Sequence, residues 1–132
     1  MKFIDHIVKE QFLDPAITDE RIVLIICYTA DWVWGEYGIE WMITGVARTP
    51  GEAAELGSPN SSHIWIPGKR LCRAIDSRTH HFDKPQLSRI MRFMRHSWGP
   101  PEYLHLIYHN SGHGDHLHVN INYPFAVEKF EA

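Results

Sequence analysis

Apolar residues repeat at helical spacing in three stretches of the chain. The spacing predicts a short helix over 2–12, a buried helix over 19–35 that ends near Gly35 or Gly38, and a further helix over 85–98. The positions that carry the two longer patterns are Ile22, Ile25, Ile26, Thr29 and Val33, and then Leu87, Ile90, Met91 and Met94.

Shorter runs with β character follow the first two of these stretches. We expect strands over 39–46, 72–78, 103–109 and 116–122. Residues 49–60 are rich in Gly, Pro and Ser and predict a loop with one helical turn. Because helices come first and strands later, without βαβ alternation, the order predicts an α+β fold. Its small antiparallel sheet would have the N-terminal helices and one further helix packed on it.

Composition agrees with a single folded unit. The chain has 132 residues, of which 44% are hydrophobic, so we predict one domain over 1–132 with its own core. The net charge of −3 gives no strong field to attract nucleic acid or an anionic membrane, and neither is expected as a partner. The apolar run 22–27 is too short to span a membrane. We expect a monomer.

The N-terminal sequence bears on where the protein is made, and the two cysteines bear on whether it has a structural zinc site. The N-terminal residues have neither the apolar segment nor the cleavage site of a signal peptide, so we expect synthesis in the cytoplasm. Cys27 and Cys72 have no CxxC neighbour, so neither is expected in a structural zinc site. Cys27 lies in an apolar run and is predicted to be buried.

The segment Gly112–Val119 has the highest density of chemically active side chains, with one carboxylate and three imidazoles. His116 and His118 are two apart and share one face of a strand, so either is a candidate metal ligand. Asp115 would lie on the opposite face of a regular strand. The two glycines before it would let the chain bend, so that Asp115 curls toward the same metal. His113, between these glycines, is a candidate cleft residue.

Two upstream residues are candidate partners for this segment. His63 follows a loop, and Asp76 lies within a short apolar strand. A carboxylate in such a strand needs a partner, because an unpaired buried charge is costly. A metal ion would satisfy Asp76, and so would an ion pair with Arg73 or Arg78.

Four blocks of the sequence occur in an order that resembles the peptidase M15 family. They are Ile43–Pro50, the pair Ser62-His63, Arg73–Asp76 and Asp115–Val119. The family comprises zinc D-Ala-D-Ala carboxypeptidases and related phage endolysins, and its fold is shared with the hedgehog signalling domain. The similarity covers about residues 39–122, and the resemblance implies a hedgehog/DD-peptidase-like fold.

The resemblance implies one catalytic zinc ion with three ligands from this chain. His63, Asp76 and His118 match the family's ligand positions. The chain departs from the family in one spacing, because His63 and Asp76 are 13 positions apart, farther than in the family's Ser-x-His-x-x-Gly-x-Ala-x-Asp block. The extra residues include Pro67 and Gly68 and could loop out.

The resemblance also implies catalytic roles around that ion. Asp115 matches the general base that activates the attacking water, and Arg48 matches the arginine that holds a substrate carboxylate or carbonyl. His116 occupies the position beside the base, where it would contact substrate. Zinc would polarise the scissile carbonyl and lower the pKa of the water, and Asp115 would pass the proton to the leaving amine.

These roles predict a metallopeptidase hydrolase that degrades the cell wall by cutting stem peptides or cross-links of peptidoglycan. The setting expected for such an enzyme without a signal peptide is phage-type release, as for an endolysin, or delivery with a virion. The alternative is a non-catalytic zinc-containing binding or assembly module on the same fold. An HNH-like nuclease is disfavoured, because its last histidine would stand in a strand and the charge does not favour DNA binding.

Overall fold

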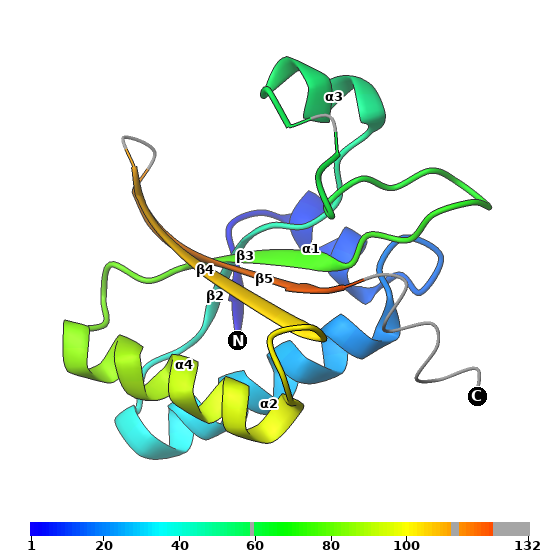
Figure 1. The fold of residues 1–132 in the computed structure, drawn as a ribbon. Coiled ribbons are helices and arrows are strands. Elements are labelled where there is room, and N and C mark those ends of the chain that lie inside the picture. Colours follow the sequence, from blue (N-terminus) through cyan, green and yellow to red (C-terminus); the bar gives the residue numbers. More distant parts are fainter. Residues whose placement is uncertain (59, 112–113, 123–132) are drawn as a thin grey trace.

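The computed structural model describes residues 1–58, 60–111 and 114–122, which form one five-stranded sheet and four helices (Figure 1). In chain order the elements are β1 (Lys2–Phe3), α1 (His6–Leu13), α2 (Glu20–Tyr37), β2 (Met42–Gly45), α3 (Pro50–Glu55), β3 (Ala74–Arg78), α4 (Lys84–Trp98), β4 (Leu104–Ser111) and β5 (Gly114–Ile121). The predicted α+β class is confirmed.

The sheet is mixed, in the order β1-β2-β3-β5-β4. The pairs β2–β3, β3–β5 and β5–β4 are antiparallel, as predicted, whereas β1 pairs with β2 in parallel. The predicted helix over 2–12 was therefore wrong in its first residues. Phe3 pairs with Ile43, and α1 begins only after Asp5, whose carboxylate accepts a hydrogen bond from the Val8 N–H at 2.8 Å.

Local capping explains where the two long helices begin and end. Asp19 caps the N-terminus of α2, and Gly38 ends it with φ +65°, a conformation that favours glycine. Asp83 and Gln86 form a capping box at the start of α4. Both helices lie on the same side of the sheet, and α3 lies on the other (Figure 1).

Strand alternation divides the sheet into an apolar face and a polar one. Ile75 on β3 and its neighbours Leu117 and Val119 on β5 are fully buried in the core that contains the α2 and α4 residues. Trp41, just before β2, is also buried, and its Nε1–H donates to Ser77 Oγ at 2.7 Å. Because alternate residues point to opposite faces, this packing directs the side chains between them to the polar face.

The two cysteines differ in exposure. Cys72 is fully buried, whereas Cys27 is exposed, so the prediction of a buried Cys27 was wrong. The buried stripe of α2 passes through Ile26 and Ala30, and Cys27 lies beside it on the helix surface. Within the described parts of the chain, none of the helices has the length and apolarity to cross a membrane.

The packing of α4 on the sheet makes a stability prediction. Met94 is fully buried, so Met94→Ala should lower the free energy of unfolding by about 2–5 kcal/mol. Leu24→Ala, at a position that is 58% exposed on α2, should change it by less than about 0.5 kcal/mol. Denaturant unfolding of both variants measures the difference, and equal effects would contradict the assigned core.

Candidate metal centre

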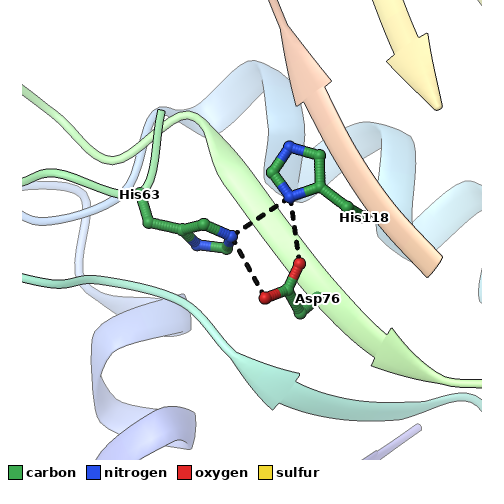
Figure 2. Close-up of side chains that lie close together, drawn as sticks. All are labelled: His63, Asp76 and His118. Carbon is green, nitrogen blue, oxygen red and sulfur yellow. Dashed lines mark hydrogen bonds and ion pairs between the residues drawn. The ribbon is translucent and has the colours of Figure 1, made fainter. Parts of the chain in front are cut away.

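Three side chains from distant parts of the sequence converge on the polar face of the sheet (Figure 2). Asp76 lies on β3 directly opposite His118 on β5, and the connection between β2 and β3 brings His63 over them. The His63 side chain is only 2% exposed, and those of Asp76 and His118 are 13% and 15% exposed. These three residues form a group that can hold a metal ion, and we call them the metal group.

The distances within this group fit a small ion. His118 Nδ1 lies 3.0 Å from Asp76 Oδ1, His63 Nε2 lies 3.2 Å from Asp76 Oδ2, and the two imidazole nitrogens are 3.3 Å apart. A tetrahedral ion with bonds of about 2.0–2.2 Å holds its ligands about 3.3–3.6 Å apart. The three donor atoms would therefore reach tetrahedral positions with shifts of a few tenths of an ångström.

The hydrogen bond of His63 Nδ1, the ring nitrogen directed away from Asp76 and His118, indicates the protonation of the other nitrogen, Nε2. His63 Nδ1 lies 2.6 Å from the Val46 carbonyl oxygen. Since a carbonyl can only accept, Nδ1 carries the hydrogen, and in the neutral ring Nε2 presents a lone pair to the group. Such a fixed tautomer is typical of a metal-ligating histidine, whose second nitrogen is held by a carbonyl or carboxylate.

Three basic side chains surround the Asp76 carboxylate. Burial alone raises the pKa of Asp76, but the hydrogen bonds and charges of His118 and His63, when these rings carry protons, outweigh burial and hold this pKa well below its usual range. The Arg48 guanidinium lies 3.5 Å from Asp76 Oδ2. Arg48 thus forms an ion pair with this carboxylate.

The extra residues between His63 and Asp76 form a small hairpin. Ile66 and Arg70 exchange backbone hydrogen bonds of 2.9 and 2.8 Å, and Gly68 turns the chain with φ +71°. The expected looping out of Pro67 and Gly68 is therefore confirmed. The 13-position spacing is compatible with His63 and Asp76 meeting at one point.

The predicted catalytic residues lie along one cleft beside the metal group. This cleft, of about 520 Å³, is lined by residues that include Arg48, Asp76, Arg78, Asp115 and His116. His116 shares the polar face with His118, two positions along β5, and its ring stacks on His109 with centroids 4.8 Å apart. Predicted His113 lies outside the described residues.

Asp115 differs from the other predicted site residues in its position on the strand and in the partner of its carboxylate. The strand β5 already begins at Gly114, so Asp115 belongs to the strand and not to a preceding loop. It borders the cleft and also a second hollow beside α4, which includes Tyr108. Desolvation, together with a hydrogen bond to Asp115 and the negative charge of this residue, raises the pKa of Tyr108. In this conformation the Asp115 carboxylate accepts from the Tyr108 hydroxyl rather than facing the metal group.

Sequence reasoning missed two residues that shape the group. Gly45 passes so close to Asp76 that a Cβ there would lie 3.3 Å from Asp76 Oδ2. Asn120, two positions beyond His118, places its Oδ1 2.9 Å from His118 Nε2. The two-residue strand period could have indicated Asn120, whereas the approach of Gly45 depends on strand pairing.

No family model, curated protein or solved structure matched the chain in the comparisons.

Metal binding should stabilise the fold through His63. At free zinc 100-fold above the dissociation constant, the free energy of unfolding should rise by about 2.7 kcal/mol. His63→Ala removes one ligand and should abolish most of this rise, whereas His96→Ala, on the exposed part of α4, should retain it. Unfolding of each variant with zinc and with a chelator gives the comparison. Equal zinc stabilisation in both variants would rule out His63 as a ligand.

The close approach of Gly45 to Asp76 makes a second prediction. Gly45→Ala should displace the Asp76 carboxylate and weaken zinc binding about tenfold or more. Gly35→Ala is the matched control, because a Cβ at Gly35 on α2 meets no atom within 4 Å. This control should keep the zinc affinity and stabilise the helix by about 0.5–1 kcal/mol. Titration calorimetry measures the affinity, and unchanged binding by Gly45→Ala would contradict the packing.

Proposed function

We propose that the protein is a zinc-dependent peptidase that hydrolyses stem peptides or cross-links of peptidoglycan, as its resemblance to the peptidase M15 family implies. One observation carries this proposal. His63, Asp76 and His118 converge with their donor atoms within 4.8 Å of one another, beside a cleft that Arg48 and His116 line. The four sequence blocks that carry the resemblance supply the residues of this one region.

Zinc suits the donor set better than other common ions. Two imidazoles and one carboxylate leave one tetrahedral position open, which is the usual arrangement of catalytic zinc in proteins. Hard ions such as Mg²⁺ and Ca²⁺ prefer oxygen ligands, which are the minority here. When bound, zinc supplies a nucleophile at neutral pH and polarises the scissile carbonyl.

The chain's own residues would bind the peptide and move the proton. Arg48, 3.5 Å from Asp76, would hold a substrate carbonyl or carboxylate beside the ligands and stabilise the negative charge that develops on oxygen. Arg78 and His116 line the same cleft, where they would donate hydrogen bonds to carbonyl or carboxylate groups of a peptide. Asp115 borders the cleft, and by leaving Tyr108 it would accept the proton of the attacking water and pass it to the leaving amine.

A non-catalytic zinc-binding module is the second candidate. The hydrogen bond between Tyr108 and Asp115 favours it, because this bond holds the expected base away from the metal group. Such a module would bind one zinc ion and recognise a partner without hydrolysing a peptide. Substrate cleavage therefore distinguishes the two candidates, whereas zinc content does not.

Mass spectrometry of digested peptidoglycan tests the peptidase proposal. The wild-type protein should release muropeptide fragments, and a chelator should stop the release. Asp115→Ala should lower the rate about 10²–10⁴-fold, because it removes the general base. Asp31→Ala, at an exposed position on α2, is the matched control and should leave the rate unchanged.

Two outcomes would contradict this proposal. Full activity of Asp115→Ala would show that Asp115 is not the general base. Release of muropeptides in the presence of a chelator would show that the reaction does not need the metal. One bound zinc ion without cleavage of any muropeptide would favour the non-catalytic module.

A further inference from the structure

The side chain of Asn122, directly after β5, has only one orientation that satisfies its neighbours. Its Nδ2 lies 3.2 Å from the Pro101 carbonyl oxygen and 2.8 Å from the Glu102 carbonyl oxygen. Carbonyl oxygens only accept hydrogen bonds, so the amide nitrogen of Asn122 must face them. The opposite orientation would bring three oxygens together with no hydrogen between them. The backbone of 101–102 thereby fixes where Asn122 Oδ1 points.

This orientation determines that of Asn120. Asn120 Nδ2 lies 3.1 Å from Asn122 Oδ1 and donates to it. Asn120 Oδ1 is then directed to His118 Nε2 at 2.9 Å. Asn120 is buried, with 6% exposure, so few alternative partners from solvent compete for its amide. An amide oxygen accepts, so this contact favours the ring form of His118 that carries a hydrogen on Nε2.

The His118 ring connects these two asparagines to the candidate metal centre. The other ring nitrogen of His118, Nδ1, lies 3.0 Å from Asp76 Oδ1 and 3.3 Å from His63 Nε2. In the metal-free protein the Asp76 carboxylate competes with Asn120 for the hydrogen of a neutral ring, and Nδ1 presents its lone pair only when that hydrogen is held on Nε2. The chain of hydrogen bonds therefore runs from two backbone carbonyls through Asn122 and Asn120 to the ring that faces the metal group.

We propose that Asn120 and Asn122 are positioning residues that select the Nε2–H tautomer of His118 and so prepare Nδ1 to bind the metal. This inference rests on the metal centre of the proposed function but not on peptide hydrolysis. Hydrogen-bond partners of metal-ligating histidines typically affect metal affinity 10–100-fold. We call this series of hydrogen bonds the relay. In the relay Asn122 acts on His118 only through Asn120, whereas two independent structural roles would give effects that do not depend on each other.

Zinc affinities of single and double variants test the relay. Asn120→Leu keeps the size of the side chain but removes the acceptor, and it should weaken zinc binding about 10–100-fold. Asn122→Ala should cause a smaller loss, because the Asn120 amide is then free to turn. In the Asn120→Leu background Asn122→Ala should have no further effect on affinity. Asn60→Ala, at an exposed asparagine outside the relay, should bind zinc like the wild type.

Nitrogen NMR of His118 provides a readout that does not depend on zinc or on activity. In the metal-free wild-type protein at neutral pH, Nε2 should carry a slowly exchanging hydrogen. Asn120→Leu should lose this protection and shift the hydrogen toward Nδ1, where Asp76 attracts it. If Asn120→Leu does not fold, Asn122→Ala should still shift the tautomer in the same direction.

Several results would overturn the relay. These are a wild-type His118 with its hydrogen on Nδ1 alone, wild-type zinc affinity in Asn120→Leu, or losses that multiply fully in the double variant. A wild-type protein that binds no zinc but keeps the Nε2 hydrogen would refute the metal centre and leave tautomer selection standing. Zinc binding with the predicted losses but without peptide cleavage would refute only the peptidase.

Discussion

The register between β3 and β5 is the constraint on which the rest of the structure depends. It places Asp76 opposite His118 and, one residue earlier, Ile75 opposite Val119. A slip of one residue on either strand would turn a carboxylate or an imidazole into the apolar core, where an unpaired charge is costly. The burial of Ile75 and Val119 against the helices therefore selects the arrangement that brings two of the candidate metal ligands together.

The third candidate ligand, His63, is held by polar contacts as well as by packing. The segment that follows β2 contacts His63 twice. The Arg48 N–H donates to the His63 carbonyl at 2.9 Å, and the Val46 carbonyl accepts from His63 Nδ1 at 2.6 Å. The same segment directs the Arg48 guanidinium to Asp76. One stretch of backbone thus couples the position of a candidate ligand, His63, to that of Arg48, the residue expected to bind substrate.

Two parts of this arrangement could be predicted from the sequence, the long helices from periodicity and the three converging residues from the family resemblance. The spacing of Ile22, Ile25 and Ile26 predicted α2, and the resemblance blocks pointed to the three residues that meet. Long-range contacts could not be predicted in the same way. The parallel pairing of β1 depends on a strand 40 positions away, at Met42, and no local pattern marks it. The two-residue period of a strand did place Asp115 on the face opposite His118. The expected bend that would turn it toward the metal was wrong, because β5 already begins at Gly114 and the Asp115 carboxylate lies with Tyr108.

The central claim is that His63 Nε2, Asp76 and His118 Nδ1 hold one zinc ion. X-ray absorption at the zinc edge of the zinc-loaded wild-type protein tests it most directly. The account predicts two imidazole nitrogens and further oxygen ligands at about 2.0–2.2 Å, with no sulfur, and loss of one imidazole in His118→Ala. A sulfur ligand at about 2.3 Å, or an unchanged spectrum in His118→Ala, would contradict it.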